Sequence, residues 1–272
     1  MIAAPAAVSV ELLRFAPQSP QTAVLFQALQ RAAESAGVHV EASSTYRGGS
    51  DWLMVWGPGH PARFEPMRQQ VARGGHVIAW DAAYWERHRK FRVSIDAAHP
   101  QAYVLRRNWA STRLREDGVV LRDRYHPDGP IIVAGLGAKA RTQYGPDRIE
   151  AWERARIAEA APCGRPILYR SKAPGAPVPL GTRAASTGPI DAVLDGVSAV
   201  ITYHSNVAVD AIRLGIPVRC QDGAAAAVCL PTWPPARLPL VVRERFLANL
   251  AWFQWTPSEA ADCWAFLREL LT

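Results

Sequence analysis

The chain has 272 residues, of which 49% are hydrophobic and 20% are charged, and its formal net charge is +7. Such a chain can bury a substantial core, which excludes a disordered or fibrous protein. No run is long and apolar enough to suggest a membrane span, and the four scattered cysteines lack the paired spacing of a zinc site. We therefore expect a cytoplasmic protein with reduced thiols, in which residues 1–13 lead into a first strand and are not a signal peptide.

Arginine supplies most of the positive charge. Its guanidinium group can bind phosphate oxygens through two parallel hydrogen bonds, so the composition suits a phosphate-bearing ligand or a nucleic acid. An arginine-rich surface is also what a GC-rich genome produces without any such ligand. The charge alone therefore leaves the partner open.

The first part of the chain alternates between apolar, strand-like runs and helical periods. Strands are expected at residues 8–15, 38–42, 51–56, 76–80 and 91–95, and helices at 21–36 and 63–73. The first six of these elements in chain order give a β-α-β-β-α-β rhythm. That rhythm indicates a small Rossmann-like domain with a parallel sheet.

Residues 82–125 are less regular, and aromatic side chains alternate there with arginines. They are Tyr84, Trp85, Tyr103 and Trp109 among Arg87, Arg89, Arg92, Arg106, Arg107, Arg113 and Arg115. Such a mixture can stack bases or sugars while it binds phosphates. The alternative is a set of core aromatics beside solvated charges, which we consider the stronger interpretation.

A second rhythm starts near residue 127. A strand at 130–134 is followed by Gly135-Leu136-Gly137-Ala138-Lys139-Ala140-Arg141. This loop lacks the full dinucleotide-binding spacing, but its backbone could approach a diphosphate, with two cations adding charge. A helix at 146–161 and a strand at 166–169 then bring Arg170-Ser171-Lys172 to the same edge of the predicted sheet.

The most informative stretch is residues 191–218, DAVLDGVSAVITYHSNVAVDAIRLGIPV. Its residues 198–203 are typical of a buried parallel strand, and a helical period follows with Ser205 or Asn206 as N-cap. A helix that begins at the carboxyl end of a strand presents free amides to an anion, and Asp210 one turn later suits a ribose hydroxyl. The alternative is an ordinary strand-turn-helix unit.

This stretch resembles the donor-nucleotide site of GT-B glycosyltransferases, and it is most similar to that of the capsule-type sugar transferases. In that family a strand is followed by a His-Ser-Ser/Asn type of turn, a helix that carries an acid, and a Gly-x-Pro-Val exit. The matching positions are His204, Ser205, Asn206, Asp210, Gly215, Pro217 and Val218. The likeness covers mainly residues 131–218. The family more often has Glu at position 210, and its capsule members often carry Lys-x-His-Pro where this chain has Arg170-Ser171-Lys172.

The resemblance implies an α/β fold with two Rossmann-like domains facing a cleft and a C-terminal helix that crosses back to the first domain. We expect an N-terminal acceptor domain at residues 1–126, completed by helices at about 243–272, and a donor-binding domain at 127–242. Residues 240–272 are helical in pattern, with a break near 256–257.

The resemblance also implies transfer of a sugar from a nucleotide sugar to a hydroxyl group without a metal ion. The nucleotide sugar is a substrate, so no cofactor is expected. The expected donor-binding residues are Gly135, Gly137, Lys139, Arg141, Arg170, Lys172, His204, Ser205, Asn206 and Asp210. Helix amides and cations of this kind stabilise the charge that develops on a nucleotide leaving group.

Sugar transfer to a hydroxyl needs a general base. Asp81 and Asp96 each follow an apolar strand, His99 comes shortly afterwards, and His60 is a weaker fourth candidate. Ligands in open α/β sheets lie beyond the carboxyl ends of strands, so we expect Asp81, Asp96 and His99 near the acceptor. Each of them could instead be a loop cap.

The acceptor and the reaction class stay open at this point. The acceptor could be DNA, for instance a hydroxymethylated base of the kind that phage glucosyltransferases modify, or an oligosaccharide or lipid-linked sugar. Two other classes of protein also fit the pattern. One is a non-catalytic nucleotide or nucleic-acid binding module, and the other is a GT-B-like nucleotide-sugar epimerase.

Overall fold

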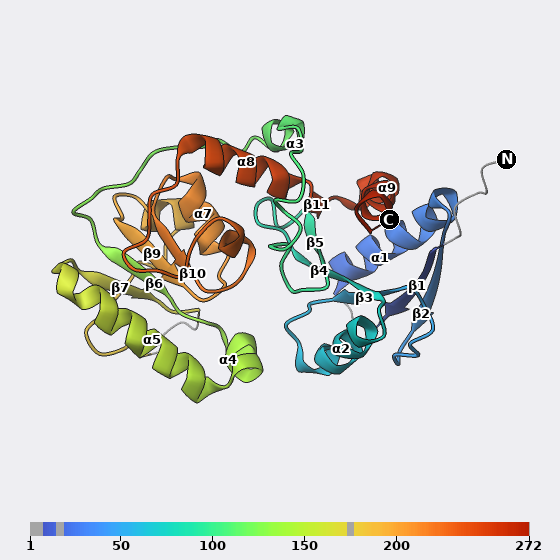
Figure 1. Ribbon diagram of the computed structural model, residues 1–272, viewed down its shortest axis with the longest axis horizontal. Coiled ribbons are helices and arrows are strands. Elements are labelled where there is room, and N and C mark those ends of the chain that lie inside the picture. The colour runs from blue at the N-terminus through green and yellow to red at the C-terminus, as the bar shows by residue number, and fades with distance from the viewer. Residues whose placement is uncertain (1–7, 15–18, 173–176, 272) are drawn as a thin grey trace. The chain divides into compact units, whose positions relative to one another are not determined.

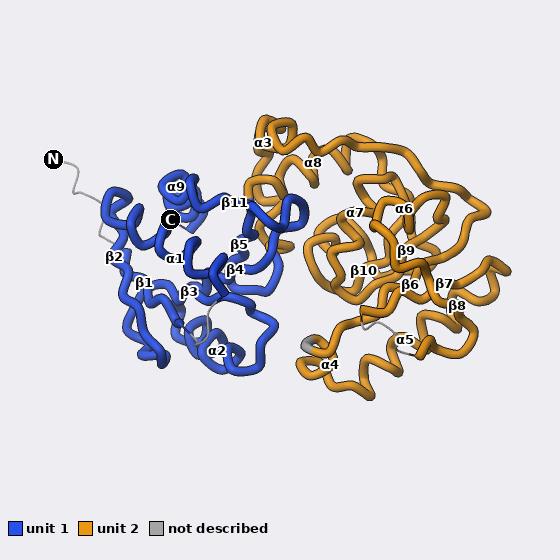
Figure 2. The backbone as a smooth tube through the Cα atoms, turned by 180° about the vertical axis from the view of Figure 1, so that it is seen from behind, with its two compact units in different colours: residues 1–99, 253–272 blue, residues 100–252 orange. Residues whose placement is uncertain are grey.

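The computed structural model describes residues 8–14, 19–172 and 177–271, and it divides into two compact units (Figures 1 and 2). Unit 1 comprises Met1–His99 and Phe253–Thr272, and unit 2 comprises Pro100–Trp252. Each unit is built on its own sheet with helices packed against it. The expected α/β fold with two sheets is therefore confirmed.

Unit 1 contains a six-stranded sheet in the order β11-β5-β4-β3-β1-β2. Its strands are β1 (Val8–Leu13), β2 (Val38–Ser43), β3 (Trp52–Trp56), β4 (His76–Ala82), β5 (Phe91–Ile95) and β11 (Gln254–Trp255). The first four are parallel, but β5 runs antiparallel to β4 and β11 antiparallel to β5. The four strands of the predicted β-α-β-β-α-β rhythm are thus parallel as expected, and the sheet becomes mixed only beyond them, because the short connection after β4 makes a hairpin instead of a helical crossover.

The helices of unit 1 are α1 (Pro20–Ala33), α2 (Phe64–Ala72) and α9 (Ala260–Leu271), with short 3₁₀ segments at Glu34–Ala36, Pro61–Arg63 and Pro257–Glu259. Helix α1 begins at Ser19, whose hydroxyl accepts a hydrogen bond from the Thr22 amide. Helix α9 packs beside α1 (Figure 1). The indole of Trp264 donates to the Leu29 carbonyl at 2.8 Å and stacks on Trp52 with ring centroids 6.3 Å apart.

The C-terminal segment thus returns to unit 1 after the chain has completed unit 2 (Figure 2). It adds β11 to the free edge of β5 and places α9 on α1. The fully buried Gln254 accepts hydrogen bonds from the amides of Tyr84 and Trp85, at 2.7 and 3.3 Å. The predicted crossing of the C-terminal helix back to the first domain is confirmed.

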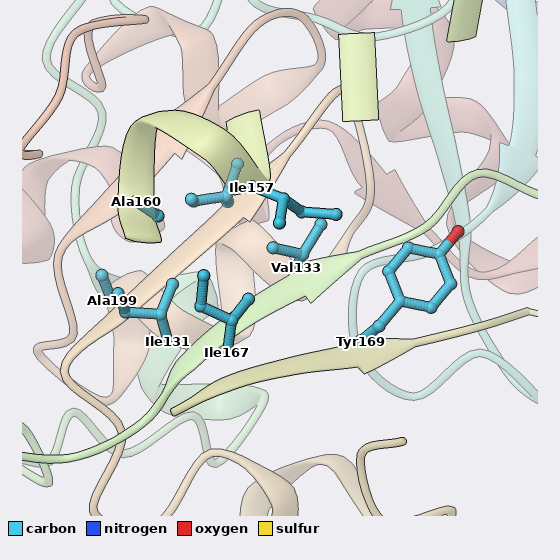
Figure 3. Close-up of a cluster of buried hydrophobic side chains, with 8 residues drawn as sticks. Ile131, Val133, Ile157, Ala160, Ile167, Tyr169 and Ala199 are labelled. Carbon is cyan, nitrogen blue, oxygen red and sulfur yellow. The ribbon is translucent and has the colours of Figure 1, made fainter. Parts of the chain in front are cut away.

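Unit 2 contains a five-stranded sheet in the order β10-β9-β6-β7-β8, and every pair in it is parallel. Its strands are β6 (Ile131–Ala134), β7 (Ile167–Arg170), β8 (Arg183–Ala184), β9 (Ala199–Thr202) and β10 (Val218–Cys220). The central strands β6 and β9 are apolar and buried along their whole length, as expected for a parallel sheet covered on both faces. One core cluster joins Ile131, Val133 and Ile157 across the sheet and its covering helix (Figure 3).

The helices of unit 2 are α3 (Thr112–Glu116), α4 (Ala138–Tyr144), α5 (Pro146–Ala160), α6 (Ile190–Val193), α7 (Val207–Arg213) and α8 (Leu240–Ala251). Short 3₁₀ segments follow α5 at Ala161–Cys163 and β10 at Ala224–Ala227. Within the described part of the chain, every helix is too short or too polar to cross a lipid bilayer.

The boundary between the units differs from the one expected from sequence, because residues 100–126 and helix α8 pack within unit 2. The amides of Arg122 and Arg124 donate to the carbonyls of Arg213 and Leu214, at 3.0 and 2.9 Å. The fully buried side chain of Asn249 in α8 donates to two carbonyls of the segment that follows residue 100. These buried polar groups have their partners in unit 2, so the segment and the helix belong there.

Candidate functional site

The carboxyl ends of four neighbouring strands define one edge of the unit 2 sheet. In the strand register Ala134 pairs with both Arg170 and Thr202, and Thr202 pairs with Cys220. The residues that leave these strands therefore emerge side by side. They are the glycine loop 135–137, residues 171–172, residues 203–206 and residues 221–223. In open α/β sheets this is the edge at which ligands bind.

The glycine loop follows β6, and its first glycine lies against a side chain of the neighbouring strand β7. A Cβ atom on Gly135 would lie 2.1 Å from the hydroxyl oxygen of Tyr169, so this position accepts glycine alone. The Gly135 amide donates to the Arg170 carbonyl at 3.0 Å. Gly137 is the N-cap residue of α4, and a Cβ there would lie 3.3 Å from the Lys172 side chain. The loop and residue 172 are therefore close neighbours.

Arg141 of α4 is engaged with a buried acid that the sequence analysis did not single out. One of its terminal nitrogens donates to both oxygens of Glu153, at 3.0 and 2.8 Å, and its Nε donates to the Leu136 carbonyl at 3.2 Å. The Glu153 side chain is only 3% exposed. Burial alone would lower the pKa of Arg141, but the bond to Glu153 outweighs it and raises the pKa. Arg141 is thus held rigidly and its charge is largely balanced.

The other predicted cations of this edge have different surroundings. The guanidinium group of Arg170 donates to the carbonyls of Ser186 and Gly188, at 3.0 and 3.4 Å, so it holds the segment after β8. Lys172 is exposed beside the glycine loop. Lys139 lies in α4, but its side chain is outside what the structure describes.

A cavity of about 1010 Å³ adjoins the glycine loop. Three predicted donor residues, Gly137, Arg141 and Lys172, line it. Its lining is mostly apolar and includes residues 177–181 together with apolar and charged side chains of α5, Glu153 among them. A volume of this order accommodates a ligand of nucleotide-sugar size.

His204, Ser205 and Asn206 lie at the same sheet edge but do not line this cavity. The His204 ring lies 5.9 Å from the ring of Tyr144 in α4 and 6.0 Å from that of Tyr203. Asn206 is the N-cap residue of α7 by position, yet its side chain makes no capping hydrogen bond.

The side chain of Ser205 caps helix α7 weakly. Its hydroxyl accepts a long, 3.5 Å bond from the Val207 amide, and its own amide donates to the Thr202 hydroxyl at 3.1 Å. Asp210 is half-buried one turn into α7, which has only seven residues. The predicted strand-turn-helix order is present, but the helix is short.

Asp222 is a further acid at this edge that the sequence analysis missed. Tyr144 donates to it at 3.3 Å, Gln101 at 3.1 Å and the Gly223 amide at 2.7 Å. Burial, followed by the charge of Asp222, raises the pKa of Tyr144. Asp222 follows strand β10, which has only three residues and was not predicted. The apolar Val218 directly after Pro217 would have been the only signal for that strand.

Two of the three predicted catalytic residues meet in unit 1, around the end of β4. Asp81 lies in β4 with its side chain 38% exposed, and it accepts hydrogen bonds from buried Arg92 at 2.9 Å and from the Ala82 amide at 2.8 Å. Arg92 also donates to the Ala98 carbonyl at 3.4 Å and lies over the ring of Tyr84. These contacts connect Asp81 to the segment that contains His99.

His99 is 7% exposed, and its Nδ1 lies 3.1 Å from the hydroxyl oxygen of Tyr84. It therefore belongs to the same polar network as Arg92, whose guanidinium group lies over that tyrosine. His60, the fourth candidate, caps a 3₁₀ segment by accepting a 3.3 Å bond from the Ala62 amide. That contact is the loop-cap role which the sequence analysis considered as the alternative.

Asp96 lies at the opposite edge of the unit 1 sheet. Strand β5 is antiparallel to β4, so its carboxyl end lies beside the start of β4. There Asp96 accepts bonds from His76 at 2.9 Å and from the Val77 amide at 2.8 Å, with its own φ at 56°. The structure therefore does not bring Asp96 together with Asp81 and His99. Among the described residues, no cluster of three or more His, Cys, Asp or Glu side chains could hold a metal ion.

Comparison with known proteins was made by sequence and by structure. No protein-family model matches the chain, and no curated protein matches it by sequence. Solved structures do match over almost the whole length. This likeness and the two α/β units define the fold as GT-B-like.

Two of the matching structures are of KpsC from Thermosulfurimonas dismutans. The one named as a beta Kdo 2,4 transferase has a TM-score of 0.55 and 14% identity, and the match covers 96% of this chain and 98% of that chain. The one named as a beta Kdo 2,7 transferase has a TM-score of 0.54 and 13% identity, with 96% and 99% covered. The TM-scores and the coverage show that the fold is shared. At identities this low, the reaction has to be argued from the site.

Proposed function

We propose that the protein is a glycosyltransferase that takes a sugar from a nucleotide sugar bound at the carboxyl edge of the unit 2 sheet. The observation that carries the proposal is the convergence at that edge of residues leaving four neighbouring parallel strands, next to a cavity of about 1010 Å³. The fold that the chain shares with two sugar transferases over nearly its full length supports the same reaction class.

The donor's phosphates are proposed to lie against the glycine loop and Lys172. Glycines allow the backbone to approach a diphosphate closely, and the exposed ammonium group of Lys172 adds a positive charge beside Gly137. Asp210 is proposed as the partner of a ribose hydroxyl, and His204 as a further contact at the neighbouring strand end. This inventory stabilises a departing nucleotide without a metal ion.

In the proposed reaction the acceptor hydroxyl oxygen forms a bond to the anomeric carbon of the donor sugar. The bond between that carbon and the donor phosphate oxygen breaks, and the nucleotide leaves with the electron pair. The proton of the hydroxyl passes to a general base. We propose Asp81 as this base, because its carboxylate is more exposed than His99 and lies at the carboxyl end of its strand, unlike Asp96.

We propose a sugar hydroxyl as the acceptor. The two related structures are named for the transfer of Kdo, which favours a saccharide substrate. A DNA acceptor has only the net charge of +7 and the arginine-rich segment in its favour. If DNA were the acceptor, its binding would fall steeply with salt.

The proposal is tested first by a thermal-shift screen of UDP, GDP, ADP, CMP and TDP and of their sugars. A ligand that binds the folded state raises its melting temperature, so one nucleotide is expected to give a clear upward shift. The shift should disappear in Lys172→Ala and persist in Arg68→Ala, which removes an exposed cation from α2. The absence of a shift with every nucleotide, together with no nucleotide release from any sugar donor, would contradict the proposal.

A further inference from the structure

We infer that Glu153 is a positioning residue of the proposed donor site, so the inference rests on the proposed function. Glu153 occupies a place where helix α5 should carry an apolar side chain. Ile149, Glu153, Ile157 and Ala160 form one buried stripe at helical spacing, and three of the four are apolar. A carboxylate buried in such a stripe is unfavourable unless it is paired and hydrogen-bonded.

The partners of Glu153 all belong to elements that form the site. Its oxygens accept bonds from the Leu136 amide in the glycine loop at 3.3 Å, from Arg141 in α4 at 2.8 Å, and from the Tyr169 hydroxyl in β7 at 3.1 Å. One buried carboxylate thus connects the loop, the helix that follows it and the adjacent strand. None of these partners belongs to α5. The bonds of Glu153 therefore connect α5 to the loop and do not form an ion pair within the helix.

Tyr169 transmits this constraint to the first glycine. Its hydroxyl donates to Glu153, accepts a bond from Arg141 at 3.3 Å, and lies 2.1 Å from the position that a Cβ atom of Gly135 would take. The Tyr169 ring therefore lies against the glycine loop, and the Glu153 carboxylate holds the Tyr169 hydroxyl group in place. Burial and the Glu153 charge raise the pKa of Tyr169 to about 12, so the tyrosine stays a donor at neutral pH.

The same network sets the direction of Arg141. Two bonds from one nitrogen to the carboxylate and one from Nε to the Leu136 carbonyl orient the guanidinium plane, and Arg141 lines the cavity. A side chain fixed in this way loses little freedom when a ligand binds beside it. Glu153 also lines the cavity, but its side chain is only 3% exposed, so it acts on the donor mainly through Arg141 and the loop.

The test is the donor KM and kcat of Glu153→Gln, measured with the nucleotide sugar found by the screen. Glutamine keeps the shape of the side chain but loses the charge that orients Arg141. We expect the KM to rise about tenfold or more, with kcat changed less than threefold, and Glu153→Asp to recover part of the loss. The matched control is Glu159→Gln, which removes ion pairs with Arg156 on the same helix and with Arg219 in β10 and should leave the KM unchanged.

A double-mutant cycle separates positioning from mere stabilisation. If Glu153 acts through Arg141, then Arg141→Lys should raise the KM strongly in the wild type and little in Glu153→Gln. Additive effects, or a wild-type KM in a Glu153→Gln protein with a lowered melting temperature, would overturn the inference and leave the proposed function standing. A wild-type protein that neither binds nor turns over any nucleotide sugar would overturn both.

Discussion

The two sheets differ in strand direction, and that difference decides how far a site can be located from sequence. The unit 2 sheet is parallel throughout, so every residue that follows a strand emerges at one edge. In unit 1 the antiparallel strand β5 sends Asp96 to the edge opposite to Asp81. The position of a residue just after a strand therefore indicates a site only when the direction of that strand is known.

The largest expected effect comes from the pair of acids that this reversal separates. Asp81→Asn should lower kcat about 100-fold or more, because a positioned base typically contributes that much. Asp96→Asn should leave kcat within about twofold and should cost about 1 kcal/mol of stability, because it weakens the bonds to His76 and the Val77 amide. Steady-state kinetics and urea unfolding of both variants provide the measurement. Equal losses of kcat in the two variants would show that strand direction does not separate their roles.

The second effect concerns glycine in the two units. Gly135→Ala should destabilise the protein by about 2–3 kcal/mol, because the added methyl group would overlap the Tyr169 hydroxyl. Gly49→Ala in unit 1 adds a methyl group that meets nothing within 4 Å, so the unfolding free energy should change by less than about 0.5 kcal/mol. Chemical unfolding of both variants decides the matter. A Gly135→Ala protein as stable as Gly49→Ala would mean that the loop has room to move away from the strand.

A third effect is the pH dependence that Tyr169 gives to unit 2. Its pKa is raised to about 12 in the folded protein, so the unfolded chain loses this proton first, near pH 10. The stabilisation is therefore complete below about pH 10 and is lost as the pH rises towards 12. The unfolding free energy of the wild type should fall by about 2 kcal/mol more than that of Tyr169→Phe over this interval. Parallel curves for the two proteins would contradict the raised pKa.

The smallest expected effect is a difference in thiol reactivity between the two units. Cys163 is exposed, whereas Cys220 and Cys229 in unit 2 and Cys263 in unit 1 are buried. Burial raises the pKa of Cys229 to about 12, so thiolate formation is suppressed there at pH 8. We expect Cys163 alone to react rapidly with a disulfide reagent in the native protein. If Cys263 becomes labelled at a different urea concentration from Cys220 and Cys229, the two units unfold separately.

The sequence predicted most strands and helices correctly because their periodicity is strong. Strand β9 and the turn after it were recognisable from an apolar run followed by helix-capping residues, and the C-terminal helices from their apolar faces. Strands β8, β10 and β11 were missed, since two or three residues are too few for a periodic signal. The position of β11 is set by pairing with β5, which is distant in the chain.

From the sequence, the candidate site was predictable only as a set of loops that follow strands, without the contacts between them. Gly137 and Lys172 were singled out by their place after strands, and both lie at the cavity. Glu153 could not be found in this way, because a glutamate in a helix is ordinarily a surface residue and its burial depends on three partners from other elements. The engagement of Arg141 escaped prediction for the same reason.

The return of residues 253–272 to unit 1 also affects how the chain can fold during synthesis. All of unit 2 is contiguous, so it can be complete on the ribosome before β11 and α9 have been made. Until they arrive, β5 is an unpaired edge strand, and Trp52 lacks its stacking partner Trp264. A nascent chain at that stage exposes a sheet edge and apolar surface that favour aggregation, so the addition of residues 253–272 completes the first unit.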